Sequence, residues 1–128
     1  MRIVLLGPPG AGKGTQAKQL AKKLDLSHIS TGDLLRENVG RATALGKDAQ
    51  DFMFKGLLVP DELVIKMLSE RFNQQDVKKG FILDGYPRNL NQAKVLDGLL
   101  KEKSMFLDLV IELDCSETVI IQRLSGRL

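Results

Sequence analysis

The first 24 residues combine a short apolar run, a glycine-rich turn and a helical repeat, and this combination constrains the fold more than any other feature. Ile3 to Leu6 is a continuous apolar run, typical of a strand that is buried on both faces. The chain then reads Gly7-Pro8-Pro9-Gly10-Ala11-Gly12-Lys13-Gly14-Thr15. Beyond it, apolar residues recur with the spacing of a helix that packs on a sheet, at Ala17, Leu20, Ala21 and Leu24. A buried strand joined in this way to a sheet-packed helix predicts an α/β fold.

The same alternation continues along the chain. Apolar runs predict further strands at 27–30, 81–83 and 107–113, and helical spacing predicts helices at roughly 33–39, 45–55, 61–72, 93–100 and 119–124. Strands that alternate with helices form a parallel sheet with helices on both faces. A chain of 128 residues suits one compact domain better than two. We therefore predict a single α/β core over residues 1–128, with four parallel strands.

The glycine-rich turn has the spacing of a phosphate-binding loop, GxxxxGK between a strand and a helix. Its glycines allow backbone N–H groups to converge on phosphate oxygens, and the helix that follows adds its positive N-terminal end. Lys13 supplies a positive charge for the β- and γ-phosphates. The position after Lys13 is Gly14, so the hydroxyl comes one residue later, at Thr15, and direct metal ligation by that hydroxyl is less well supported. The motif predicts a P-loop NTPase-like core, and the alternative is a glycine-rich turn without a ligand.

Polar residues follow the second and third predicted strands. The segment Ser30–Arg36 follows one strand, and Asp84–Arg88 follows the other. Because the carboxyl ends of parallel strands face the same crevice, these residues should lie on the side of the phosphate loop. Arg36 and Arg88 carry planar guanidinium groups that can hold one phosphate bidentately, and Asp84 has the form of an acid that positions Mg²⁺ through water. A surface arginine or a strand-terminating turn is the ordinary alternative for each of them.

Composition excludes several other classes. The net charge is +3 without a long run of like charge, which does not indicate a nucleic-acid-binding surface. Only four apolar positions precede Gly7, fewer than the roughly 7–15 of a secretory signal or the roughly 20 of a membrane helix. Cys115 is the single cysteine, so no internal disulfide can form, and we interpret it as a packed thiol. These features predict a soluble, cytoplasmic protein without nucleic-acid or membrane partners.

The motifs together resemble the adenylate kinase family of P-loop nucleoside monophosphate kinases, and the resemblance runs from Met1 to the last residue. The matching stretches are Gly7–Gln16, Ser30–Arg36, Gly56–Asp61, Asp84–Arg88 with Gln92, and Arg123–Arg127.

The resemblance implies reversible phosphoryl transfer from ATP to AMP, giving two ADP, with Mg²⁺ bound to ATP. It implies a monomer for the complete protein. It assigns catalytic roles to Lys13, Arg88 and Arg123. The ATP-binding residues that it implies are Gly10, Ala11, Gly12, Lys13, Gly14, Thr15, Arg123 and Arg127. The AMP-binding residues are Thr31, Arg36, Leu57, Leu58, Val59, Gly85, Arg88 and Gln92, with the segment at about 31–60 as a mobile AMP-binding subdomain. Asp84 is the first candidate to hold Mg²⁺ through water, and Asp33 is the second.

The identity of the acceptor base depends on Gln92. Related kinases of UMP and CMP usually carry Asn at that position, whereas a Gln side-chain amide can pair with the edge of adenine. Leu57, Leu58 and Val59 would provide an apolar seat for a purine. The sequence therefore favours AMP, with a UMP/CMP kinase as the alternative. His28, the only histidine, has no carboxylate pattern near it in the sequence, and we interpret it as structural.

Members of the family continue beyond the equivalent of Leu128 with a lid over ATP and a further strand. The resemblance therefore predicts that the lid and the C-terminal part are missing, and that the fourth strand is an unpaired edge. A nucleotide-binding fragment without catalysis, or with weak activity, is accordingly the competing hypothesis. The acceptor half, Thr31 to Gln92, favours a kinase, because a passive ATP-binding module does not need it.

Overall fold

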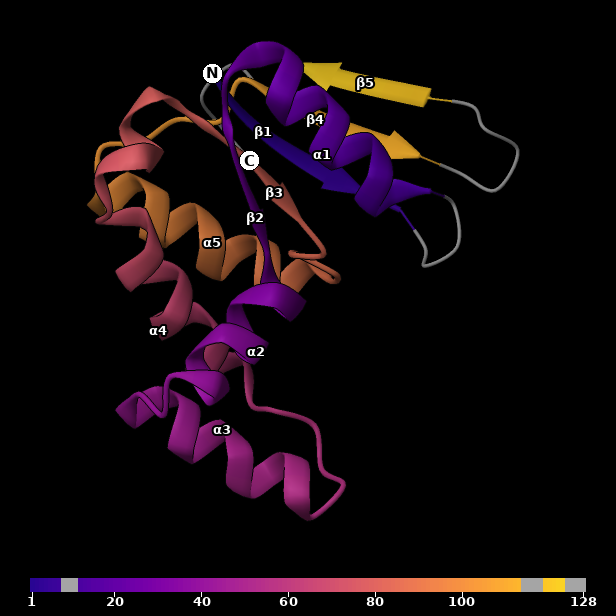
Figure 1. The fold of residues 1–128 in the computed structure, drawn as a ribbon. Helices are drawn as coiled ribbons and strands as arrows, with labels where there is room; N and C mark the ends of the chain where they lie inside the picture. Colours follow the sequence, from indigo (N-terminus) through magenta and orange to yellow (C-terminus); the bar gives the residue numbers. More distant parts are fainter. Residues whose placement is uncertain (8–11, 114–118, 124–128) are drawn as a thin grey trace.

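The computed structural model describes residues 1–7, 12–113 and 119–123 (Figure 1). The strands are β1 (Arg2–Leu6), β2 (Ser27–Ser30), β3 (Phe81–Asp84), β4 (Leu109–Leu113) and β5 (Val119–Arg123). The helices are α1 (Lys13–Leu24), α2 (Thr31–Gly40), α3 (Ala44–Phe54), α4 (Asp61–Phe72) and α5 (Leu90–Glu102), with a 3-10 turn η1 (Gln75–Lys79) before β3.

The strands form one sheet in the order β2-β3-β1-β4-β5, and the first four in that order are parallel. The prediction of an α/β core with four parallel strands is therefore confirmed. The register sets Ser30 and Leu5 on either side of Asp84, at the carboxyl ends of their strands. Because β1 lies beside β3 inside the sheet, Gly7, which follows β1, lies at this end of the sheet.

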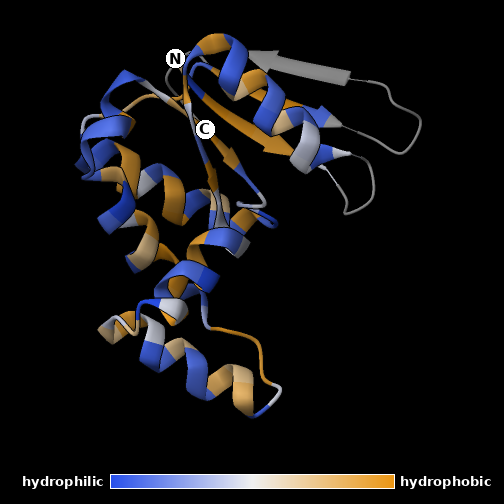
Figure 2. Ribbon diagram, viewed as in Figure 1, coloured by the Kyte–Doolittle hydropathy of each residue, from blue (hydrophilic) through white to orange (hydrophobic). Residues whose placement is uncertain are grey.

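Two apolar layers cover the sheet. Ile3 and Leu5 of β1 pack with Ala17 and Ala21 of α1 on one face, as the strand's alternation of side chains requires. Val4, between them in sequence, points to the opposite face, where α4 and α5 contribute fully buried side chains. Figure 2 shows apolar residues along the sheet strands and polar residues on the outer sides of the helices. This two-sided burial explains why β1 and β3 read as unbroken apolar runs.

The C-terminal end of the described chain corrects one prediction. Val119–Arg123 forms strand β5, antiparallel to β4, with Leu113 opposite Val119 and Leu109 opposite Arg123. The helix predicted at 119–124 is therefore wrong, and so is the unpaired edge predicted for the fourth strand. Two factors favour the strand. The β-branched run Val119-Ile120-Ile121 has low helix propensity, and pairing gives the backbone groups of β4 hydrogen-bond partners. Residues 114–118, which include Cys115, lie outside the described residues.

Helices α2 and α3 lie apart from the sheet, beyond the carboxyl end of β2 (Figure 1). Ser30 ends β2 and is also the N-cap of α2, where its side chain accepts from the backbone N–H of Asp33. Thr43 caps α3 in the same way through the N–H of Gly46. The segment then returns to the core at α4. Within the described chain, none of the helices has the length and apolar character needed to cross a membrane.

Candidate active site

A buried carboxylate at the end of β3 is the centre of the site. Asp84 is 5% exposed, and its Oδ1 lies 2.5 Å from Nζ of Lys13, the first residue of α1. Its Oδ2 lies 3.2 Å from Nε2 of His28, on the neighbouring strand β2. A carboxylate removed from water needs a charged or hydrogen-bonded partner, and Lys13 supplies one. The strand order and the start of α1 at Lys13 therefore bring a lysine and a histidine from distant parts of the chain to one acid.

The N-terminus of α1 suits an anion. Gly12 is its N-cap, with φ of 77°, and among the described residues no side chain caps the first turn of the helix. The free N–H groups of a first helical turn and the helix dipole favour negative charge. Gly14 and Thr15 lie exposed in this turn. Gly10 and Ala11, which are predicted to bind ATP, lie outside the described residues.

Gly85 marks the point at which the two halves of the site meet. Its φ is 86°, and a methyl group there would lie 3.2 Å from Thr31 Oγ1 and 3.9 Å from both Lys13 Nζ and Arg88 Nη2. Its carbonyl oxygen accepts from Arg88 Nε at 3.0 Å and from the hydroxyl of Thr31 at 3.5 Å. Lys13 and Arg88 thus approach one small region of space, and the positive φ of Gly85 favours glycine there.

A hollow of about 190 Å³ adjoins this point. It is lined by Thr31, Gly32, Leu35, Asp61, Val64, Gly85, Tyr86, Arg88 and Gln92. Four of the residues predicted to bind AMP therefore come together here: Thr31, Gly85, Arg88 and Gln92. The hollow combines a guanidinium group, a side-chain amide and two aliphatic walls, which can receive a phosphate, a base edge and a ring.

Four other residues predicted to bind AMP, and one predicted to bind metal, lie elsewhere. Arg36 is exposed and pairs with Asp33 of its own helix. Leu58 is 94% exposed in the linker between α3 and α4, and Leu57 beside it is also exposed. Val59 packs at the edge of the core. The structure therefore does not bring these residues to the hollow around Gly85.

The C-terminal arginines stay predictions. Arg123 belongs to β5, where only the backbone is described, and Arg127 lies outside the described residues.

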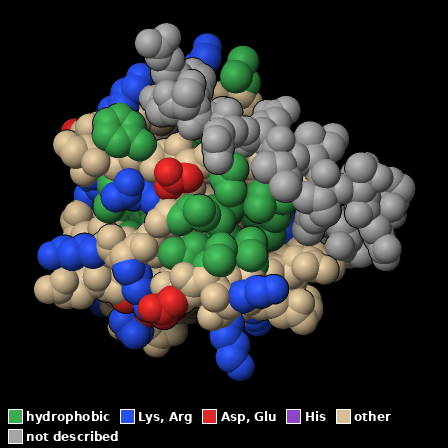
Figure 3. All heavy atoms as spheres, turned by 90° about the horizontal axis from the view of Figure 1, so that it is seen from above, with side chains coloured by type: hydrophobic (Ala, Val, Ile, Leu, Met, Phe, Trp, Pro, Cys, Tyr) green, Lys and Arg blue, Asp and Glu red, His purple; other side chains and the backbone are tan. Residues whose placement is uncertain are grey.

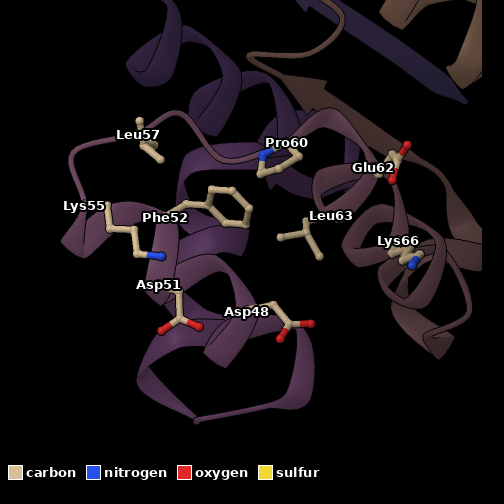
Figure 4. A pocket seen from close by; sticks show the side chains of 9 residues that line it. All are labelled: Asp48, Asp51, Phe52, Lys55, Leu57, Pro60, Glu62, Leu63 and Lys66. Carbon is tan, nitrogen blue, oxygen red and sulfur yellow. The ribbon is translucent and has the colours of Figure 1, made fainter.

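A larger hollow, of about 390 Å³, lies between α3 and α4 (Figure 4). The ring of Phe52 and the side chain of Leu63 face each other across it, with Pro60 above them and Asp48 and Asp51 at its other end. It contains one residue predicted to bind AMP, Leu57, and none of those predicted to hold a phosphate. We therefore place the candidate active site at the smaller hollow, which adjoins Gly85, where Lys13 and Arg88 approach one point.

Three residues of the site were not predicted. His28 contacts Asp84, and Asp61 accepts a hydrogen bond from Gln92 Nε2 at 2.9 Å. Tyr86 is 3% exposed, and its hydroxyl has no hydrogen-bond partner among the described residues. Burial raises the pKa of this phenol, and the Asp61 carboxylate raises it further. Asp61 and Tyr86 lie in stretches that resemble the family, but no local pattern indicates the contact of His28 or of Asp61, because their partners are distant in sequence.

Basic side chains do not gather into one patch on the face that Figure 3 presents. Figure 3 shows Lys and Arg side chains scattered around an apolar centre on the face that it presents, without a continuous basic band. Among the described residues, no group of three or more His, Cys, Asp or Glu side chains could enclose a metal ion. A metal at Asp84 would therefore have at most two such ligands from the described residues, which suits an ion that keeps most of its water ligands.

A parallel arrangement of β1 to β4 with helices on both faces, in which the first strand leads through the GxxxxGK motif into α1, is the fold of a P-loop α/β protein. The chain belongs to the adenylate kinase family, whose sequence profile matches residues 5–127.

Curated relatives agree with this assignment. The chain is 52% identical over 127 residues to an adenylate kinase of Caldicellulosiruptor bescii, 54% to one of Streptomyces avermitilis and 53% to one of Stenotrophomonas maltophilia. Each alignment covers 99% of this chain. The chain spans 59%, 58% and 68% of the length of these relatives, respectively.

Proposed function

We propose that this protein transfers the terminal phosphoryl group of ATP to AMP, reversibly, giving two ADP. The observation that carries the proposal is the convergence at Gly85, where Lys13 Nζ and Arg88 Nη2 lie equally close to one point. A phosphoryl group in transfer needs cationic groups from both the donor and the acceptor side. Family membership and identities of 52–54% to adenylate kinases support the same reaction.

On the donor side, the first turn of α1 would hold the phosphates of ATP through its backbone N–H groups. Lys13 would reach the β- and γ-phosphates from the position where it now pairs with Asp84. Because an ammonium group has three donors, Lys13 can contact a phosphate while it keeps one hydrogen bond to the acid.

On the acceptor side, Arg88 would hold the phosphate of AMP and the amide of Gln92 would meet its base. The hollow offers Leu35 and Val64 as walls for the ring. No general base is required, because the AMP phosphate is already an anionic nucleophile, and transfer depends on positioning and charge stabilisation.

Mg²⁺ that arrives with ATP would neutralise charge on the transferring phosphate. The residues present fit such an ion: Asp84 is a buried carboxylate at the carboxyl end of β3 and can bind its water ligands. Asp33 is exposed and paired with Arg36, so Asp84 is the better candidate.

Segment 31–60 would close over AMP when it binds. An aliphatic side chain that is 94% exposed, as Leu58 is, has apolar surface to bury, and a purine in the hollow would provide a partner. The same movement would release Arg36 from Asp33 toward the phosphate. We further propose that Arg123 and Arg127 reach ATP.

A coupled assay of ADP formation from ATP with AMP, CMP or UMP tests the proposal, together with titration of each nucleotide. Arg88→Met should lower AMP-dependent transfer about 10²–10³-fold, by analogy with other groups that stabilise transition-state charge. Arg41→Met is the matched control, because Arg41 is an exposed arginine that pairs with Glu37 and does not line the hollow.

A passive nucleotide-binding module would bind ATP but show no AMP binding that depends on Arg88. A UMP/CMP kinase would prefer a pyrimidine acceptor. Either result would replace the proposed reaction.

A further inference from the structure

We propose that Asp61 is a specificity-determining positioning residue: it locks the side-chain amide of Gln92 in the orientation that reads adenine and rejects 6-oxopurines. The inference rests on the proposed function, since it names how the acceptor site would choose its purine. It concerns a residue at the start of α4 that would act on the base only through Gln92.

The amide of Gln92 is held from both ends. Its Oε1 accepts from the backbone N–H of Arg88 at 2.7 Å, and its Nε2 donates to Asp61 Oδ1 at 2.9 Å. Its backbone N–H is bound as well, by the side chain of Asn89, the N-cap of α5. Gln92 is thus fixed at its main chain and at both atoms of its amide.

The two partners leave one orientation of the amide. A backbone N–H can only donate, and an ionised carboxylate can only accept. Turning the amide of Gln92 by 180° would set Nε2 against the N–H of Arg88 and Oε1 against the carboxylate of Asp61. Both hydrogen bonds would be lost, and the second is charge-assisted. The oxygen and nitrogen of a side-chain amide are often hard to tell apart by position alone. Here the hydrogen-bonding chemistry of the two partners decides which atom is which.

The locked amide still has capacity for a ligand. Nε2 carries a second hydrogen and Oε1 a second lone pair, and both Gln92 and Asp61 line the hollow of the candidate active site. Adenine presents a donor at its 6-amino group and an acceptor at N1, so it pairs with an amide that offers oxygen to the first and nitrogen to the second. A 6-oxopurine presents the reverse pattern, acceptor then donor, and needs the amide turned around.

Asp61 is well placed for this role because its backbone is held by helix α4 and by the proline before it. It is the first residue of α4, directly after Pro60, whose ring restricts the chain at the N-cap. Asp61 is also exposed, so water competes for its hydrogen bond. The free-energy penalty for turning the Gln92 amide therefore lies in the lower part of the range for charge-assisted hydrogen bonds. We expect a contribution to discrimination of about tenfold.

The test compares AMP with inosine monophosphate, which differs from AMP at the 6-position and N1 alone. Affinities of both are measured by calorimetric titration of the same chain carrying Asp61→Asn. The side-chain amide introduced by that substitution can either accept or donate, so it no longer opposes the turned orientation of Gln92. The ratio of the AMP affinity to the inosine monophosphate affinity should fall about tenfold, mainly because the 6-oxopurine binds better.

Glu62→Gln is the matched control. Glu62 lies next to Asp61 in the first turn of α4 and carries the same charge, but it faces the larger hollow and has no hydrogen bond to Gln92 among those of the described residues. Its substitution should leave the ratio unchanged. On a Gln92→Leu background, Asp61→Asn should have no further effect on the ratio, because the group through which it acts is gone.

A second measurement needs no nucleotide. In the NMR spectrum of the free protein, the side-chain NH₂ of Gln92, identified by its loss in Gln92→Glu, should have one proton shifted downfield by the carboxylate. That shift should disappear in Asp61→Asn and persist in Glu62→Gln. The inference is overturned if the affinity ratio stays the same in Asp61→Asn, or if the amide signals do not change. If the unsubstituted chain binds neither purine monophosphate, the proposed function fails, and this role of Asp61 fails with it. If the chain binds AMP but the affinity ratio is the same in Asp61→Asn, only the role of Asp61 is refuted.

Discussion

Lys13→Met should destabilise the folded chain, in addition to weakening phosphate binding. Lys13 Nζ lies 2.5 Å from the carboxylate of Asp84, and the two side chains are 16% and 6% exposed. Breaking a buried ion pair costs about 3–5 kcal/mol, because one charge stays buried without its partner. The end of Lys13 is partly exposed, and His28 Nε2 at 3.2 Å can still donate to the acid. We therefore expect a loss below that range, about 2–3 kcal/mol of unfolding free energy.

Urea denaturation followed by far-UV circular dichroism measures this loss. For a domain of this size, it corresponds to a fall in Tm of roughly 8–12 °C. Asp84→Asn should also destabilise, and the double variant should lose clearly less than the two single losses combined, since the partners interact directly. Lys18→Met is the control, because Lys18 is exposed on the same helix and has no ion pair within the described chain. Equal urea midpoints for Lys13→Met and Lys18→Met would refute the reasoning.

Three further substitutions test the surroundings of the site and the pH dependence of stability. Gly85→Ala should cost about 1–2 kcal/mol of stability from its φ of 86° alone and should weaken AMP binding more than ATP binding. Gly98→Ala, in α5 with open space around it, should instead stabilise by about 0.5–1 kcal/mol in thermal unfolding; a similar loss for both would contradict the argument. Hydrogen bonds from Arg71 hold the pKa of Asp76 well below its usual range, so this pair stabilises the fold above about pH 4 and ceases to do so as pH falls through the lowered pKa. Asp76→Asn should therefore lower stability by about 1 kcal/mol at pH 7, given the exposure of the pair, and the difference from the unsubstituted chain should shrink below pH 4 in urea titrations; a difference independent of pH would exclude this linkage.

Local sequence was enough to predict the frame of the protein. The apolar run before Gly7 and the helical spacing after it predicted β1 and α1, because burial on both faces of a sheet demands a continuous apolar strand. The same reasoning predicted β2, β3 and β4 and the helices between them. The helix predicted at 119–124 failed, because strand pairing with β4 outweighed a short apolar repeat that both structures can satisfy.

Some features of the site could also be predicted from local sequence, and others depend on the tertiary structure. Lys13 and Arg88 were predicted from motifs that consist of neighbouring residues. Their approach to one point at Gly85 depends on β3 lying beside β1, which is a matter of strand order. The composition of the hollow likewise depends on how α4 and α5 pack.

By itself, the sequence determined the α/β alternation, the phosphate-binding loop and the polar residues at the ends of the strands. Periodicity and turn chemistry act over a few residues and can be read locally. Only the tertiary structure decided that His28 contacts Asp84, that Asp61 holds Gln92, and that Arg88 faces the hollow. His28 and Asp61 meet partners 56 and 31 residues away along the chain. Such contacts form where strand order and helix packing bring the backbone together, because a hydrogen bond depends on distance in space, which no local pattern encodes.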